Sequence, residues 1–167
     1  ALLSWRWIGL IALDFKKQDR TAAGWLLDYD YRKQAYKEAS ERFSTLGATV
    51  NTGLPHGSGV GNPTERKGMT LAELDRQRLW IKTVEDATRT LGDKKRAFLQ
   101  LRRLAESIDN GGEVGRPSWI DFVQIRFADW HERKYGKAFI PAKRTMFCWW
   151  NEIVETTVRI AIRRGLL

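Results

Sequence analysis

The sequence predicts an all-α protein, and three observations lead to this fold class. Apolar residues recur at helical spacing through most of the 167 residues. No region is rich in strand patterns, and clusters of glycine, proline and small polar residues separate the periodic segments. We therefore expect a helical bundle or antiparallel helical arm, followed by a C-terminal helix-turn-helix-like unit.

The N-terminal third contains one predicted helix. Residues 1–20 carry apolar side chains without a clean period, so helix and strand both stay open there. From Thr21 onward the apolar residues follow helical spacing. Their positions between Trp25 and Phe43 predict a single helix over Thr21–Leu46, which Gly47 ends.

The apolar opening, Ala1–Leu13, raises the question of a membrane segment. It is too short to span a bilayer and it contains Arg6. It also lacks the charged leader and small-residue cleavage site of a signal peptide. We expect a buried or partner-facing segment and no membrane association.

A glycine-rich stretch, Ala48–Asn62, predicts a flexible loop. It lacks the Gly-Lys-Ser/Thr ending of a phosphate-binding loop, and His56 within it has no second metal ligand nearby. Asn62 and Pro63 then form a helix start, as N-cap and first helical residue.

Two helices are predicted after this loop, one from Pro63 to about Leu91 and a second over Lys94–Ile108, with Gly92-Asp93 between them. The basic residues of the second helix lie on its polar side. They are expected either to be solvated or to contact a DNA backbone, and the sequence does not decide between these two interpretations.

The clearest boundary in the chain is Asp109–Pro117. Ser118 then offers an N-cap, with Asp121 three residues on as in a capping box, for a helix over Trp119–Tyr135. Gly136 is expected to turn the chain.

The last predicted helix lies in Ile140–Leu167. Pro141 suits its first turn, and Arg163-Arg164-Gly165 places basic charge and a glycine stop at its end. The short start Pro-Ala-Lys-Arg-Thr is small, basic and hydroxylated, which is the chemistry of a DNA recognition helix. The alternative reading of Lys143 and Arg144 is a solvated helix tip.

These elements divide the chain into four predicted parts: an N-terminal helical region (1–47), a Gly-rich linker (48–62), a charged helical hairpin (63–110) and a C-terminal helix-turn-helix-like region (111–167).

Composition narrows the class of function. The net charge of +9 suits association with nucleic acid or another anionic surface. Cys148 is the only cysteine, so we expect no internal disulfide, a buried structural thiol and a reducing compartment. The two histidines are isolated and no nucleophile motif occurs, so we expect neither an enzyme nor a bound cofactor or metal.

The order of parts resembles a known family. The loop LPHGSGVGNPTE is similar to the Met-Pro-Arg-Gly-Ser-Gly…Asp-Pro-Thr linker of the ArpU/RinA-like phage late-gene transcriptional regulators. Their Arg-Tyr-containing helix and terminal Arg-Thr recognition helix correspond here to Phe122–Phe127 and Lys143–Trp149, and the resemblance covers Trp25–Leu167. The intervening segment, Asp129–Ile140, is more charged than the family's scaffold helix and lacks its Ile-Ala pair.

The resemblance implies a phage or prophage protein in the cytoplasm of a bacterial host. It also implies a sigma-factor-like C-terminal helix-turn-helix that binds double-stranded DNA. A homo-oligomer is expected, because a symmetric dimer of helical arms would read a palindrome.

The candidate DNA contacts cluster at the start of the last helix. Arg144 is the candidate for a guanine contact, Lys143 and Thr145 for a phosphate or a neighbouring base. The candidates that enter the major groove are Ala142, Lys143, Arg144 and Phe147, and those that hold the backbone are Arg116, Arg133, Lys134 and Lys137.

Two other classes of function stay open. One is a phage DNA-packaging subunit, similar to a small terminase, in which case a ring of many subunits is expected. The other is a helical protein-interaction module, for example one that contacts RNA polymerase, which would not bind DNA and would tolerate neutralisation of Lys143 and Arg144.

Overall fold

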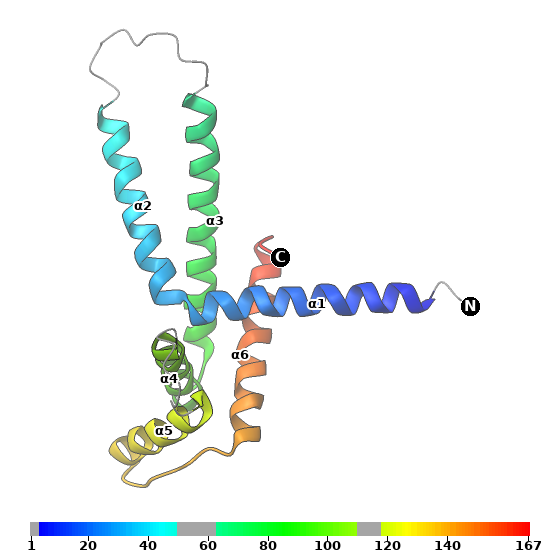
Figure 1. Ribbon diagram of the computed structural model, residues 1–167, viewed down its shortest axis with the longest axis vertical. Helices are drawn as coiled ribbons and strands as arrows, with labels where there is room; N and C mark the ends of the chain where they lie inside the picture. The colour runs from blue at the N-terminus through cyan, green and yellow to red at the C-terminus, as the bar shows by residue number, and fades with distance from the viewer. Residues whose placement is uncertain (1–3, 50–62, 110–117) are drawn as a thin grey trace.

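The fold is helical wherever it is defined. The computed structural model describes residues 4–49, 63–109 and 118–167, and gives side-chain surroundings for 16–45, 71–108 and 118–167. Every regular element in these ranges is a helix, so the predicted all-α class is confirmed. The helices are α1 (Ser4–Leu27), α2 (Tyr29–Thr49), α3 (Pro63–Thr90), α4 (Asp93–Asp109), α5 (Trp119–Tyr135) and α6 (Lys143–Arg163) (Figure 1).

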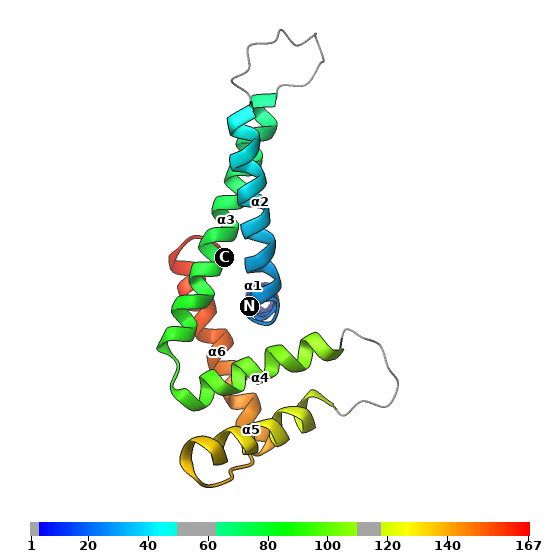
Figure 2. The ribbon, with the colours of Figure 1, turned by 90° about the vertical axis from the view of Figure 1, so that its left-hand side faces the viewer.

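The helices form an arm and a body. Helices α2 and α3 pack side by side and make a long antiparallel arm (Figures 1 and 2). The body is formed where α6 packs against α1, α3 and α4, and α5 packs against α4. The predicted N-cap Asn62 and most of the predicted glycine loop lie outside the described residues.

The single helix predicted over Thr21–Leu46 is wrong. The chain bends at Asp28, where α1 ends and α2 begins, and the two helices diverge sharply in direction (Figure 1). Backbone hydrogen bonding continues through the bend, because the Asp28 N–H donates to the Gly24 carbonyl at 3.0 Å. The apolar period therefore also continues through it, which is why the sequence pattern gave no sign of a bend.

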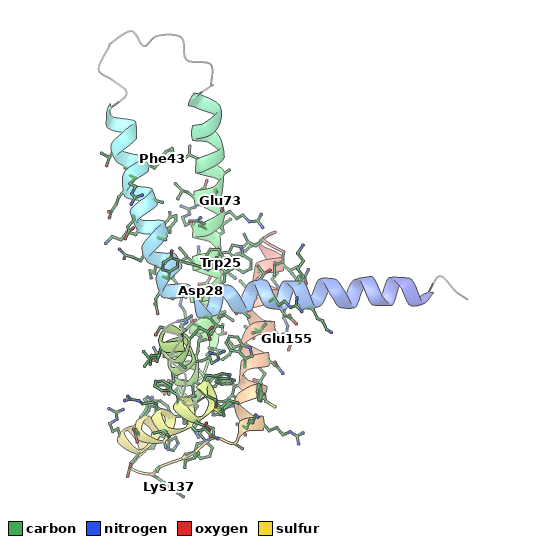
Figure 3. The ribbon with its side chains drawn as sticks, in the orientation of Figure 1. Trp25, Asp28, Phe43, Glu73, Lys137 and Glu155 are labelled. Carbon is green, nitrogen blue, oxygen red and sulfur yellow. The ribbon has the colours of Figure 1, made fainter. Side chains whose placement is uncertain are left out.

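Tertiary contacts on either side of Asp28 hold this bend. Trp25 stacks on Trp80 of α3 with ring centroids 5.3 Å apart. Tyr29 donates its hydroxyl to a Glu85 carboxylate oxygen at 2.7 Å. Both partners lie on α3, so one helix anchors the end of α1 and the start of α2 (Figure 3).

The core joins buried residues of α1, α3, α4, α5 and α6, and its aromatic part lies where α4, α5 and α6 meet. Phe98, Phe127 and Met146 are fully buried there. The Trp149 ring contacts both Phe98 and Phe127, with centroids 5.7 and 5.5 Å apart. These contacts fix the direction of α6 relative to α5.

The C-terminal end of α6 is fastened to α3. Arg164 donates to the Thr83 hydroxyl at 2.9 Å and pairs with the Asp86 carboxylate. Gly165 has a φ of 67°, and the Leu166 N–H donates to the Ala161 carbonyl at 3.0 Å. This is a Schellman motif, so the predicted glycine stop is confirmed.

We predict that Phe127→Ala lowers the free energy of unfolding by about 3–5 kcal/mol, because it removes the ring at the centre of the aromatic core. Ile125→Ala, two residues away on the same helix, is the matched control, since Ile125 is 63% exposed and should change stability by less than about 0.5 kcal/mol. Urea unfolding followed by circular dichroism measures both. Equal effects of the two changes would contradict this packing.

Candidate nucleic-acid interface

The candidate site is the corner where α5 is joined to α6. Helix α5 spans the range predicted for it, and Gly136 ends it with a φ of 69°. Seven residues, 136–142, then lead to α6, which is longer than the three- or four-residue turn of a helix-turn-helix. Whether this unit belongs to that class stays a prediction.

The predicted helical position of Pro141 is wrong. Helix α6 starts at Lys143 with Ala142 as its N-cap, and Pro141 precedes both. Pro141 is buried, and its carbonyl accepts a hydrogen bond from the Gln124 side chain at 2.9 Å. This proline therefore anchors the connecting segment to α5 and does not open the helix.

A second contact fixes the same segment at its beginning. The Nδ1 atom of buried His131 lies 2.6 Å from the Lys137 carbonyl oxygen. The His131 ring also packs on Tyr135 and Phe139, with centroids 4.6 and 5.4 Å apart. The backbone that carries Lys137 is thus held in place, while its side chain is exposed at the lower tip of the molecule (Figure 3).

Lys143 and Arg144 are two unpaired cations of this corner. Both are exposed, and neither makes a hydrogen bond or ion pair with the side chains that the structure describes. Ala142 offers no side-chain cap to the first N–H groups of α6. The helix start therefore combines two free cations with uncapped amide donors, an arrangement suited to an anion.

Three other residues predicted to contact DNA are less accessible than Lys143 and Arg144, because they are bonded within the protein or partly buried. Lys134 donates to Asp93 of α4 at 2.6 Å, and the Arg133 Nε–H donates to the Asp129 carbonyl at 3.2 Å, so both are engaged within the protein. Thr145 is half-buried.

Phe147 belongs to the same exposed face as the free cations. It is 40% exposed and meets the Trp119 ring edge-on at 5.8 Å. Arg116 lies outside the described residues, so its predicted backbone contact has no structural description.

The charged residues from the end of α5 to the second turn of α6 are all positively charged. Residues 133–151 contain five basic residues and no acidic one. The next carboxylate along α6, Glu152, pairs with Lys95 of α4. Lys143 and Arg144 therefore give the start of α6 a positive charge that no described carboxylate compensates, and Arg163 at the far end of the helix is a further exposed, unpaired cation.

Two further cations border this face, and the sequence analysis did not include them among the site residues. Lys94 of α4 is exposed and lies 5.2 Å from the Phe139 ring centroid. Arg126 of α5 is exposed and lies 5.6 Å from the Phe122 ring centroid. The sequence left the basic residues of the Lys94–Ile108 helix open as DNA-backbone contacts, and the packing of α4 on α5 is what brings Lys94 to the corner.

Two smaller predictions also need correction. Cys148 is exposed, not buried, because it lies one turn beyond Arg144 on the outward face while Met146 and Ile153 face the core. Ser118 occupies the N-cap position of α5 but makes no side-chain cap, since its hydroxyl donates to the Asp121 carboxylate at 3.1 Å instead.

Comparison of the chain with protein-family models, with curated proteins and with solved structures gives no match. Among the described residues, no helix combines the length and apolar character needed to cross a bilayer. Within the same residues, no three His, Cys, Asp or Glu side chains gather where they could hold a metal ion.

The hydrogen bond from Lys134 lowers the pKa of Asp93 below its ordinary value. The stability that this pair contributes is therefore present above the ordinary pKa of an aspartate and is lost as the pH falls through the lowered pKa. We predict that carboxyl NMR titration finds Asp93 below its usual range, and that Lys134→Met moves the pKa upward. Lys134→Arg, which keeps a charged donor, should leave it low. An unchanged pKa in Lys134→Met would show that the pair is absent.

Proposed function

We propose that this chain is a double-stranded DNA-binding transcriptional regulator, encoded by a phage or prophage, which acts by binding and not by catalysis. The observation that carries the proposal is the start of α6, where Lys143 and Arg144 are exposed and unpaired next to uncapped backbone donors. Phosphates and base edges are the ligands that such a helix start accommodates.

The exposed face of α6 suits a major groove. Arg144 and Cys148 lie one turn apart on it, and the face stays free of carboxylates as far as Asn151. Arg144 has the length and planar fork to pair with a guanine edge, which is worth about 1–3 kcal/mol of discrimination.

Backbone contacts would come from the surrounding cations. Lys137, on its anchored loop, and Lys143, at the helix start, are unpaired and exposed, so they can meet phosphates without breaking an internal contact. Lys134 can do so only if it leaves Asp93. We therefore assign the main salt-dependent contribution to Lys137 and Lys143, with Lys94 and Arg126 at the edge.

A protein-binding role for the same corner is the second candidate, and one observation favours it. Large apolar side chains are exposed around the corner, among them Ile140 at 67% and Ile125 at 63%. A partner such as RNA polymerase would be held by these side chains and not by the cations. A packaging subunit would use the same cations on DNA and would differ in assembling as a ring.

We predict that Lys143→Ala/Arg144→Ala weakens binding to random duplex DNA and reduces the slope of log K against log salt by about 2, since two phosphate or base contacts are lost. Fluorescence anisotropy with a labelled duplex, titrated with salt, measures both quantities. The matched control is Lys82→Ala/Arg163→Ala, which removes the same charge from exposed positions on α3 and at the far end of α6.

The control should retain a nearly normal slope. If the slope falls equally in both double variants, DNA binding depends only on the net charge of the protein. That result would contradict a binding site at the start of α6. Wild-type protein that fails to bind duplex DNA even at low salt would contradict the proposed function and favour the protein-binding role.

A further inference from the structure

Helix α6 presents one outward face from its start to Asn151. The face is formed by Arg144, Phe147, Cys148 and Asn151, whose spacing places them on one side of a helix. All four side chains are exposed, whereas Met146 on the opposite side is fully buried. The packing of the inner side therefore fixes which residues the outward face presents.

Asn151 is a polar member of this face that the fold does not use. Its side chain is exposed and forms no hydrogen bond with any group that the structure describes. Two polar neighbours on α6 are engaged, since Glu152 pairs with Lys95 and Glu155 pairs with Arg159. Asparagine is also one of the weaker helix formers, so helix stability does not explain its presence in the middle of α6.

Carboxylates mark where this face ends. Asn151 borders a groove between α1 and α6, and the residues that line this groove include the acidic Asp19 and Glu155 and the basic Arg20. Glu155 lies on α6 near α1 (Figure 3). Two carboxylates against one cation disfavour a DNA phosphate there. Asn151 is therefore the last position of the face that a duplex can approach before it meets acidic residues.

The side chains of this face match the edges of base pairs in a major groove. An asparagine amide carries both a donor and an acceptor, which pair with N7 and the N6 amino group of adenine. The arginine fork pairs with a guanine edge in the same way. Phe147 and Cys148 lie between Arg144 and Asn151 and offer apolar contact, which suits the methyl group of thymine.

We propose that Asn151 contacts an adenine in the major groove and so determines part of the DNA sequence that the protein selects. This assignment rests on the proposed function. Asn151 lies seven residues beyond Arg144, which is roughly 10 Å along α6. Successive base pairs are roughly 3.4 Å apart, so the adenine lies roughly three base pairs from the guanine that Arg144 contacts.

The first test is selection of binding sites from a pool of duplexes with randomised sequence. Wild-type protein should enrich a guanine and an adenine roughly three base pairs apart. Asn151→Ala should retain the guanine and lose the adenine, because only the adenine contact is removed. The matched control, Gln100→Ala, removes an exposed amide from α4 and should enrich the wild-type site.

Three results of the selection would overturn the proposal. Wild-type sites could contain no adenine at this spacing, Asn151→Ala could enrich the same adenine as wild type, or Gln100→Ala could lose the adenine as well. Each would show that Asn151 does not determine this base.

The second test identifies the atom that Asn151 contacts. Replacing the selected adenine with 7-deazaadenine removes the N7 acceptor and keeps the base pair. The dissociation constant of wild type should rise by about fivefold or more, which corresponds to the lower end of the discrimination given by a bidentate contact. The dissociation constant of Asn151→Ala should not change. Equal weakening of both proteins would overturn the contact.

The outcomes separate this proposal from the proposed function. Asn151 would contact a base and no phosphate, so Asn151→Ala should bind random duplex DNA with the affinity and salt dependence of wild type. If wild type binds duplex DNA through Lys143 and Arg144 but no selected adenine depends on Asn151, the assignment of Asn151 alone fails. If wild type binds no duplex DNA, the proposed function fails and the assignment fails with it.

Discussion

The packing of α6 is the constraint on which the rest of the structure depends. Its buried stripe, from Met146 to Ala161, lies against three other helices, and Arg164 fastens its end to α3. Met146 and Ile153 belong to the fully buried core, so rotating or withdrawing α6 would expose the centre of the protein. Because the inner face is fixed in this way, the outer face is fixed as well. The position of Arg144 follows from the burial of residues on the opposite side of its helix.

The corner before α6 shows how buried contacts prepare an exposed surface. His131 and Gln124 are not candidates for ligand contact, yet they hold the carbonyls of Lys137 and Pro141. A segment tied at both ends loses little conformational entropy when a partner binds, which favours affinity. The same corner exposes apolar side chains such as Ile140, so cations and apolar groups are both available to a partner.

Ion pairing divides the basic residues into two kinds. Lys95 and Lys134 neutralise carboxylates of neighbouring helices, and Arg103 donates to the Leu26 carbonyl at 2.6 Å. Burial lowers the pKa of Arg103, which indicates a guanidinium used for packing. Lys143 has no such partner among the described residues. The total of 29 lysines and arginines therefore overstates the cations that a nucleic acid could meet, and the exposed unpaired ones include Lys143 and Arg144 at the start of α6 as well as residues of α1 and α3 such as Lys16 and Lys82.

Local sequence signals predicted most of the helices, but they did not predict the directions of the helices or the partners of the charged residues, which depend on tertiary packing. The bounds of α5 were correct, because Ser118 and Gly136 mark both of its ends. The bend at Asp28 was missed, since it depends on the stacking of Trp25 on a distant tryptophan of α3. The pairing of Lys134 was missed for the same reason, because its partner Asp93 lies on another helix. Periodicity identifies faces of helices, whereas the direction of each helix and the partners of each charge come from the three-dimensional arrangement.

One measurement tests the central claim, that the outward face of the first two turns of α6 meets DNA. Cys148 is the only cysteine in the chain, is exposed, and lies one turn beyond Arg144 on that face. The rate at which a maleimide reagent alkylates it can be measured with and without saturating duplex DNA. The account predicts strong protection at low salt, relieved as salt releases the DNA. An alkylation rate unchanged by bound DNA would place the contact elsewhere and contradict the account.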